Sequence, residues 1–389
     1  MAIKKELKFP KGFLWGSAVS AHQVEGNNVN SDWWEWEQKG GGKEHSGTAC
    51  NFYNRYEEDI KIVRDLNQNA FRLSLEWARI EPGMGEFSKK EMEHYREILK
   101  SLKDKGITTF VTIHHFTNPI WFANLGGWEN CKSSKYFSRY VKYCAHHFED
   151  LVDLWITVNE PTVYAGQSYL LGLWPPQKKN FLRACRVFLN MIEAYNKTSL
   201  SLKKPHGIAH NIPRFTGSKN PLDLLLAKSL NFIFLDIPIL LCLKKQDFIG
   251  VNYYSQFKIK NGKFSFDYLL GRTDMEWPIA PEGLYKILLN LKKYKKPIYI
   301  TENGCADSQD KIRKFYIKEH LKAAHMAIEN GVDVRGYFYW SLIDNFEWHW
   351  GFKPRFGLVE IDRRNNLKRK IRKSAKCYSK VCEENLMKP

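Results

Sequence analysis

Short apolar stretches typical of β-strands alternate eight times with segments that have the spacing of amphipathic helices. This alternation limits the fold more than any other feature, because a strand followed by a helix, repeated without long linkers, builds a parallel sheet. Eight such units predict one closed (β/α)8 barrel, a TIM barrel, as a single domain over residues 1–389. The predicted strands are residues 13–18, 70–75, 108–115, 154–160, 207–211, 248–254, 298–302 and 334–342.

Helices are expected in the intervals between these strands. Apolar residues recur at spacings of three and four from Tyr56 to Leu66, which predicts one helix. The charged amphipathic stretch at residues 89–105 predicts another, closed by Gly106 as helices often are. Further helices are expected over residues 136–151 and 181–202, and from Glu282, Lys311 and about Lys368 onward.

The composition supports a large core and argues against nucleic acid as a partner. The chain is 43% hydrophobic, although its length of 389 residues alone does not separate one barrel from two domains. The formal charge of +18 invites an anionic partner, but Lys and Arg are scattered apart from one cluster at residues 363–373. A solvated helix face explains that cluster more simply, so we expect no nucleic acid partner. An anionic surface as a partner of another kind is left open.

Cysteine usage and the apolar runs favour a cytoplasmic protein. The eight cysteines form no C-x-x-C pair and have no histidine cluster beside them, so free thiols and no metal site are expected. The first ten residues are charged and lack the apolar core of a secretory signal. The longest apolar run, residues 232–243, contains Asp236 and Pro238 and is too short to cross a bilayer, so no membrane partner is expected.

Two predicted strands end on a carboxylate. Glu302 follows the apolar residues 297–301 and precedes the turn signal Asn303-Gly304, and Glu160 ends a strand of the same form. A charge at the end of a buried strand is costly unless a partner compensates it. Hydrogen bonding within the turn is the structural alternative for either residue. Two such carboxylates at one end of a barrel are what the cleavage of a sugar bond needs.

The carboxyl ends of the strands, where barrel enzymes carry their active sites, are rich in polar and aromatic side chains. Any one of them could be structural, since a lone His or Trp is usually a core residue. So many together are hard to explain by packing alone. They are His22, Gln23 and Glu25; Arg72 and Trp77; His114 and His115; Asn159 and Glu160; Asn252, Tyr253 and Tyr254; Glu302; and Trp340, Asp344, Asn345, Glu347 and Trp348.

These stretches resemble glycoside hydrolase family 1, the β-glucosidase family, over nearly the full length of the chain. The resemblance implies a retaining β-glycosidase that hydrolyses terminal β-D-glycosyl residues of a small β-glycoside or short oligosaccharide, with no cofactor and no metal. The residues that carry it are 13–16 (Phe-Leu-Trp-Gly), 22–26 (His-Gln-Val-Glu-Gly), 71–80, 157–161 (Thr-Val-Asn-Glu-Pro), 247–254, 300–304 (Ile-Thr-Glu-Asn-Gly) and 339–348.

The resemblance also implies a role for each matching residue. Glu302 matches the nucleophile and Glu160 the general acid/base. Arg72 near Glu302 would favour its charge, and that charge would help to keep Glu160 protonated. By the same resemblance, Arg72 and Tyr254 support the nucleophile and Asn159 bonds the sugar 2-hydroxyl. Trp340 lies under the sugar ring and Trp277 forms the wall of the aglycone site. The residues implied to bind the remaining hydroxyls are Gln23, His115, Glu347 and Trp348.

The sequence departs from the family pattern in three places. Residues 231–247 form a shorter interval than usual, which puts the fifth helix and the cleft wall beside it in doubt. His349-Trp350 replaces the small-acidic pair that often follows Glu347-Trp348, and Phe116 stands where Trp often follows the histidine. Cys305, just beyond the nucleophile, is expected to pack rather than to react.

Two alternative functions stay open beside β-glucosidase activity. One is a degenerate barrel that binds sugar without turnover, which the shortened interval suggests and the two carboxylates oppose. The other is a 6-phospho-β-glycosidase, which the basic charge favours. Against it, Glu347 would repel a 6-phosphate, and Arg355 and Phe356 stand where such relatives carry Lys and Tyr. Gluco-, galacto- and fuco-specific enzymes share the same sugar-binding residues, so this preference is left open, as is the oligomeric state.

Overall fold

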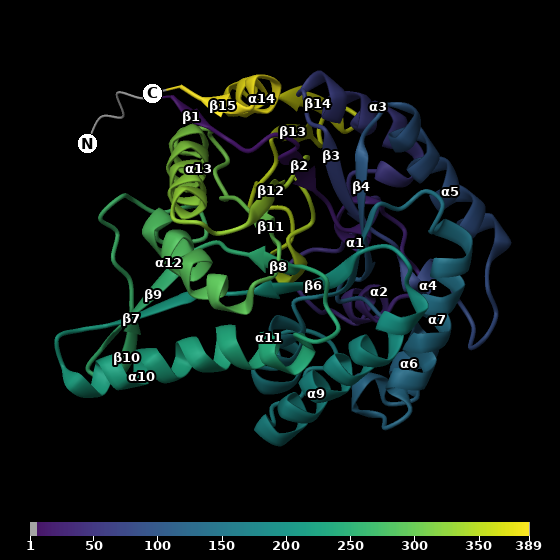
Figure 1. The fold of residues 1–389 in the computed structure, drawn as a ribbon. Helices are drawn as coiled ribbons and strands as arrows, with labels where there is room; N and C mark the ends of the chain where they lie inside the picture. The colour runs from purple at the N-terminus through teal and green to yellow at the C-terminus, as the bar shows by residue number, and fades with distance from the viewer. Residues whose placement is uncertain (1–5, 389) are drawn as a thin grey trace.

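A computed structural model describes residues 6–388 and contains the predicted barrel (Figure 1). Its eight strands are all parallel and close in the order β11-β12-β2-β3-β4-β5-β6-β8. Each strand agrees with a predicted one to within two residues, so the (β/α)8 prediction is confirmed. The strands are β2 (Leu14–Ala18), β3 (Ala70–Ser74), β4 (Thr108–His114), β5 (Leu154–Asn159), β6 (His206–Asn211), β8 (Ile249–Asn252), β11 (Ile298–Asn303) and β12 (Val334–Trp340).

Helices surround the barrel and begin and end at local signals. In α5, the Ser88 hydroxyl accepts from the Glu91 amide at 3.3 Å, and beyond its end Gly106 takes a φ of +70°. The longer helices are α3 (Phe52–Asp65), α5 (Lys89–Asp104), α7 (Ser133–Phe148), α9 (Phe181–Thr198), α10 (Pro221–Asn231), α12 (Pro281–Leu291), α13 (Arg313–Glu329) and α14 (Lys373–Glu384). The shorter ones are α1 (Ala21–Val24), α2 (Asp32–Gln38), α4 (Trp77–Ile80), α6 (Ile120–Asn124), α8 (Pro161–Ala165) and α11 (Ile237–Cys242).

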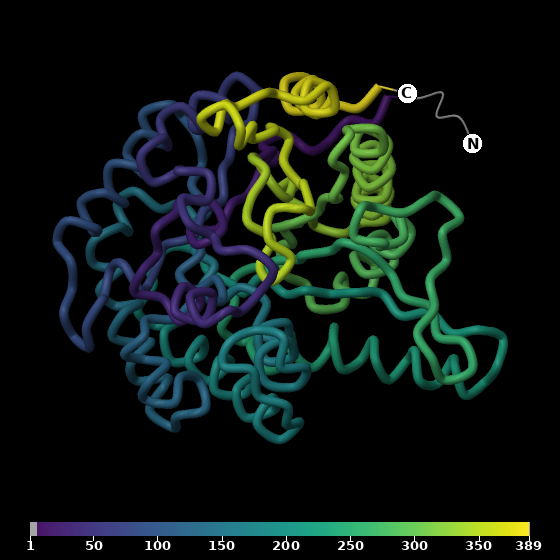
Figure 2. Tube along the Cα trace, turned by 180° about the vertical axis from the view of Figure 1, so that it is seen from behind, coloured from purple at the N-terminus to yellow at the C-terminus, as the bar shows by residue number. Residues whose placement is uncertain are grey.

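Seven short strands lie outside the barrel, and the sequence pattern did not predict them. They are too short to show a period of two. Strands β1 (Leu7–Lys8) and β15 (Leu386–Met387) pair antiparallel and bring the two ends of the described chain together (Figure 2). The others are β7 (Arg214–Gly217), β9 (Gln256–Lys260), β10 (Lys263–Ser265), β13 (Val359–Asp362) and β14 (Lys368–Ile371).

Aromatic side chains fill the barrel interior. The ring of Phe110 lies 5.4 Å from that of Phe248, 5.1 Å from Tyr299 and 5.0 Å from Phe338, all edge-on. A Cβ added at Gly16 would come within 2.7 Å of the Phe338 ring, so glycine on β2 leaves room for it. Aromatic rings therefore fill the barrel interior here, and an active site is expected at the carboxyl ends of the strands.

The expected helix from about Lys368 is wrong, and so is the solvated helix face proposed for the basic cluster. Residues 368–371 form strand β14, antiparallel to β13, and α14 begins only at Lys373. Arg369 is buried and pairs with Asp59 at 2.8 Å, and Arg372 is buried and pairs with Asp344 at 2.7 Å. The composition of the cluster suggested solvation, but carboxylates far away in the sequence compensate these two charges.

The apolar run after residue 220 is longer than the sequence pattern suggested. Helices α10 and α11 join through a π-helical turn at Phe232–Asp236 into one continuous helix, Pro221–Cys242. It is 22 residues long and its most apolar 18-residue stretch has a mean hydropathy of 1.9, which is long and apolar enough to cross a bilayer, so the prediction from residues 232–243 alone was wrong. Only 22% of its most apolar stretch is buried, and α10 runs outward from the barrel body (Figures 1 and 2).

Candidate active site

Both strand-end carboxyls face one cavity at the carboxyl end of the barrel. The cavity has a volume of about 330 Å³ and is lined by nine of the eleven predicted site residues. The other two, Gln23 and Arg72, are buried directly behind it and bond to residues of the lining. The structure therefore brings all eleven together. The nine in the lining are His115, Asn159, Glu160, Tyr254, Trp277, Glu302, Trp340, Glu347 and Trp348.

Glu302, on β11, lies between a cation and a phenol. Arg72 Nη1 donates to its Oε1 at 2.5 Å, and Tyr254 Oη donates to its Oε2 at 2.5 Å. Both donors favour the ionised carboxylate. Burial acts in the opposite direction and prevails, because the pKa of Glu302 is raised above its ordinary value in spite of Arg72 and Tyr254.

Glu160 follows β5 at the start of α8, with a left-handed backbone (φ 45°). Only amides bond to its carboxyl group: Asn252 Nδ2 donates to Oε1 at 2.8 Å and Asn211 Nδ2 at 3.2 Å. Burial first, and the charge of Glu302 second, raise the pKa of Glu160 to about 8. At neutral pH Glu160 is therefore mostly protonated, so the cavity holds a carboxylic acid opposite a carboxylate that has its own cation.

Asn303 is the last residue of β11 and Gly304 follows it, and neither lies in a turn, so the turn predicted from Asn-Gly is wrong. A Cβ at Gly304 would lie 1.9 Å from the carbonyl oxygen of Trp340, so no other residue fits unless the strands separate. Asn303 Nδ2 donates to the Tyr253 carbonyl at 2.6 Å and joins the end of β11 to the segment after β8. The two residues therefore hold the strand end that carries Glu302 against the segments that carry Trp340 and Tyr254.

A chain of polar contacts runs from Arg72 to His115 across the cavity floor. Asn159 Oδ1 accepts from Arg72 Nη2 at 2.6 Å, and Asn159 Nδ2 lies 3.2 Å from His115 Nε2. This contact assigns Nε2 as an acceptor, so the proton of neutral His115 sits on Nδ1. Burial, and then Arg72, hold the pKa of His115 well below its ordinary value. Nδ1 is buried with no partner in the described chain.

Glu347 is a third acidic group of the cavity and lies on the loop after β12. Gln23 Nε2 donates to it at 3.3 Å, and Ser20 Oγ fixes the glutamine by donating to its Oε1 at 2.6 Å. Burial, Glu302 and Glu160 raise the pKa of Glu347 to about 8. The lining contains no Lys or Arg, and residues 6–388 contain no group of three or more His, Cys, Asp or Glu that could hold a metal ion.

Aromatic rings form the walls of the cavity. The His115 ring lies nearly parallel to those of Trp340 and Trp348, at centroid distances of 5.9 Å and 6.1 Å. On the opposite side, Trp277 lies 5.6 Å from Tyr254 and 6.2 Å from Phe356. Flat apolar faces beside a few fixed polar groups are suited to a sugar ring, whose own faces are apolar and whose rim carries hydroxyls.

Three residues of the site were not predicted in their roles. Asn252 was noted only as a strand-end residue, and Asn211 ends β6 in the same manner, yet only closure of the barrel shows that both bond to Glu160. Trp174 lies in a loop without any pattern and could not have been found. Its Nε1 donates to His349 Nδ1 at 2.8 Å, and its ring lies 4.9 Å from Phe116. The two departures from the family pattern therefore meet at one wall of the cavity mouth.

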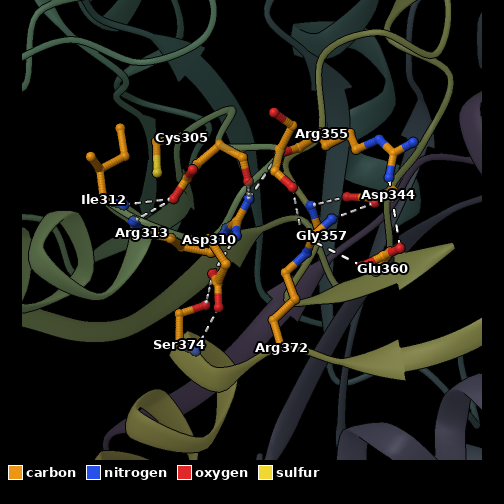
Figure 3. A network of polar contacts seen from close by, with 12 residues as sticks. Cys305, Asp310, Ile312, Arg313, Asp344, Arg355, Gly357, Glu360, Arg372 and Ser374 are labelled. Carbon is orange, nitrogen blue, oxygen red and sulfur yellow. Dashed lines mark hydrogen bonds and ion pairs between the residues drawn. The ribbon is translucent and has the colours of Figure 1, made fainter.

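A buried ionic network behind the site supports the loop that carries Glu347 and Trp348 (Figure 3). Asp344 accepts from Arg372 at 2.7 Å and from the Gly357 amide at 3.0 Å, so it binds this loop rather than a sugar. Arg313 Nη2 donates to the carbonyl of Arg355 at 2.8 Å. Cys305 is buried beside this network, 3.9 Å from a tyrosine hydroxyl, and does not line the cavity. Its expected packing role agrees with this location.

Comparisons with known proteins place the chain in a family. The sequence model of glycosyl hydrolase family 1 matches residues 5–213 and 223–387. The β-glucosidase A of Thermotoga maritima is 34% identical, over 97% of this chain and 98% of that protein. That alignment runs over 439 positions, more than the 389 residues of this chain, so the chain has internal deletions relative to it.

Solved structures give the same result. A β-glycosidase from Pyrococcus horikoshii is similar with a TM-score of 0.94 and 38% identity, over 99% of this chain and 97% of that one. A β-glucosidase from Thermotoga maritima in complex with glucoimidazole is similar with a TM-score of 0.92 and 34% identity, over 97% and 99%. With a family match on both sides of residues 214–222 and relatives covered almost in full, the chain belongs to glycosyl hydrolase family 1 and is a glycosidase.

Proposed function

We propose that this protein is a retaining β-glycosidase of the β-glucosidase type, with Glu302 as nucleophile and Glu160 as general acid/base. The observation that carries the proposal is the contrast between two buried carboxyls of one cavity. Glu302 accepts from Arg72 and Tyr254, whereas Glu160 accepts only from amides and has a pKa of about 8. A retaining glycosidase needs one ionised and one protonated carboxyl, about 5 Å apart.

In the first step the Glu302 carboxylate attacks the anomeric carbon, and the bond from that carbon to the leaving oxygen breaks. Glu160 gives its proton to the leaving oxygen, and a glycosyl ester forms on Glu302. The ester carries no charge, so the main neighbour that raised the pKa of Glu160 is gone. Glu160 then takes a proton from water, and the water oxygen attacks the anomeric carbon. The ester bond breaks, Glu302 regains its charge, and two inversions give net retention.

We assign sugar recognition to groups that are already fixed before a ligand enters. His115 lines the cavity and is assigned to one hydroxyl, and Asn159, held by Arg72, faces the 2-hydroxyl as the family resemblance implies. Gln23 and Glu347 are bonded to each other and can bind two adjacent hydroxyls. Trp340 and Trp348 present ring faces on either side of the His115 ring. Such preorganised groups lose little entropy on binding.

The acidic lining supports a free hexose rather than a 6-phosphosugar. Three carboxyl groups face the cavity, and no Lys or Arg does. Sites for phosphate dianions use cations, bidentate arginine above all. A phosphate beside Glu347 would also keep that group protonated or be repelled by it. We therefore propose β-glucosides as substrates, with β-galactosides or β-fucosides as further candidates, and not their 6-phosphates.

Replacement of the nucleophile tests the assignment. Glu302→Ala should abolish hydrolysis of an aryl β-glucoside and leave the melting temperature close to that of the wild type. Azide or formate should restore part of the turnover and give the α-configured product, because a small anion then attacks in place of the carboxylate. Glu347→Ala is a matched control that also removes a cavity carboxyl, and anions should not rescue it. Substantial retaining activity of Glu302→Ala would show that the assignment is wrong.

We also propose a cytoplasmic location. All eight cysteines are free, five of them buried, which suits a reducing compartment. Fractionation of native cells with an antibody to the protein tests this, and recovery of the protein mainly from the culture medium would contradict it.

A further inference from the structure

Exposed apolar side chains are concentrated on one part of the molecule. Thirteen of the 27 large hydrophobic side chains exposed in the described chain lie between residues 222 and 270, in about one eighth of the chain. Eight belong to the continuous helix Pro221–Cys242 and five to β10 and the loop after it. We call these two segments, residues 221–242 and 263–270, the apolar arm. Apolar patches of this kind mark binding surfaces in soluble proteins.

The helix of the apolar arm is apolar on both of its faces. Its inner face packs on the protein through residues such as Ala227, Leu235 and Ile239, which are 4%, 3% and 0% exposed. Leu222, Leu225, Leu226, Phe232 and Ile233 share the opposite face and are 39–73% exposed. A helix of this composition is normally covered all round, whereas here one side has no cover within the described chain.

Three side chains bond this helix to other segments of the protein, at its first turn, its middle and its second half, so it lies on the protein and does not span a membrane. Asp223 accepts from the amides of Asn261 and Gly262, both at 2.9 Å, which holds the first turn against the β9–β10 hairpin. Asn231 Nδ2 donates to the Phe215 carbonyl at 2.8 Å. Asp236 accepts from Lys293 at 2.5 Å. A helix held along one face offers the other to an interfacial layer, as peripheral membrane helices do.

Cations surround the exposed face. The six lysines with no ion pair to any described residue in this region are Lys219, Lys228, Lys244, Lys245, Lys260 and Lys263. Lys228 lies on the exposed face itself, one turn from Leu225 and Phe232. The acidic residues of the helix, Asp223 and Asp236, are both bonded within the protein. Apolar side chains among unpaired lysines match an anionic lipid surface, where the two attractions add.

We propose that the apolar arm binds the surface of a bilayer that contains anionic lipids. Two arms of the same chain would bring their lysines together, and the chain carries a net charge of +18, so a second copy fits this surface less well. A bilayer accepts both the leucines and the lysines. This inference is independent of which carboxyl is the nucleophile.

Docking through the arm would keep the cavity near the lipid surface. Phe257, on β9, lines the cavity and packs 5.9 Å from Phe215 and 5.9 Å from Phe266. Phe266 belongs to the apolar arm and is 44% exposed. One continuous row of aromatic side chains therefore leads from the cavity wall to the proposed lipid-binding surface.

Co-sedimentation of the full chain with vesicles tests the proposal. The wild type should bind vesicles of phosphatidylcholine with phosphatidylserine, and bind phosphatidylcholine alone more weakly. The triple variant Leu225→Gln, Phe232→Gln, Ile233→Gln should lose roughly ten-fold or more in partitioning. A control triple variant at exposed positions elsewhere, Leu125→Gln, Phe315→Gln, Met326→Gln, should bind like the wild type. Hydrolysis of a soluble aryl β-glucoside should be equal in all three and reports that each is folded.

Charge-reversal variants separate the electrostatic attraction of the lysines from the apolar attraction of the leucines. Lys228→Glu, Lys244→Glu, Lys263→Glu should reduce binding to the anionic vesicles, and Lys100→Glu, Lys135→Glu, Lys314→Glu should reduce it much less. Failure of the wild type to sediment with anionic vesicles, or equal losses in the arm and control variants, overturns the proposal. So does a dimer in sedimentation velocity that the arm variant turns into a monomer, because a second copy then covers the arm. A wild type that does not hydrolyse the β-glucoside would contradict the proposed glycosidase function and would not contradict the proposed binding to lipid.

Discussion

Tyr254→Phe isolates one hydrogen bond to the proposed nucleophile. The phenol donates to Glu302 Oε2 at 2.5 Å; the glutamate is buried, and the tyrosine is half-buried where it lines the cavity. A hydrogen bond to a charged group contributes about 1.5–3 kcal/mol, and 1.36 kcal/mol corresponds to one pKa unit. The bond favours the ionised form, so its loss should raise the pKa of Glu302 further, by about one to two units.

The assay is the pH profile of kcat/KM for an aryl β-glucoside. The acid limb reports ionisation of Glu302 in the free enzyme, so it should move to higher pH by about one to two units. Activity should therefore fall most at acidic pH and recover partly as pH rises. The basic limb, assigned to Glu160 with its pKa of about 8, should move little in comparison.

Tyr253→Phe is the matched control. Its hydroxyl donates to the Ala280 carbonyl at 2.6 Å, away from the cavity, and its side chain is fully buried, whereas that of Tyr254 is half-buried. That variant should lose stability without any change in the acid limb. An unmoved acid limb in Tyr254→Phe, or an equal movement in both variants, would refute the reasoning about how the carboxylate of Glu302 is stabilised.

Three further predictions follow from the same cavity. Glu160→Ala should slow substrates with poor leaving groups at least about 100-fold more than activated aryl glycosides, because only the former need its proton; equal losses in steady-state assays would exclude proton transfer. A glucoside should exceed its 6-phosphate in kcat/KM by at least about ten-fold, since acids and no cations line the cavity; a preference for the phosphate would contradict the substrate assignment. Gly304→Ala should lower the melting temperature by several degrees and reduce kcat, because its Cβ would lie 1.9 Å from the Trp340 carbonyl; thermal melts with unchanged stability would show that the two strand ends can separate freely.

Local pattern was sufficient for the barrel and for most of the site. Each barrel strand is a short apolar run bounded by turn residues, and parallel strands put their carboxyl ends at one edge. Glu160 and Glu302 could therefore be placed together before any coordinates were known. The family motifs then supplied Trp277, which stands on no predicted strand and carries no local signal of its own, and they gave a role to Gln23, which follows the first predicted strand.

Interactions between distant segments decided what the pattern could not. The basic run at residues 368–373 resembles a solvated helix, but Asp59 and Asp344 compensate two of its arginines, so it forms a strand and a buried network. The pKa of Glu302 depends on a balance between burial and Arg72, and a sequence shows the cation without showing the burial.

The continuous helix Pro221–Cys242 shows most clearly the difference between what the sequence determines and what the tertiary structure decides. The sequence alone indicated an apolar run at residues 232–243 and left the helix there in doubt, whereas the tertiary structure extended the helix over residues 221–242 and showed that one of its faces has no described residues against it. Hydropathy is a property of each side chain, while exposure depends on which other segments come to cover it. The net charge of +18 can be read from the sequence, but the surface that it favours depends on where the unpaired lysines lie in the folded protein.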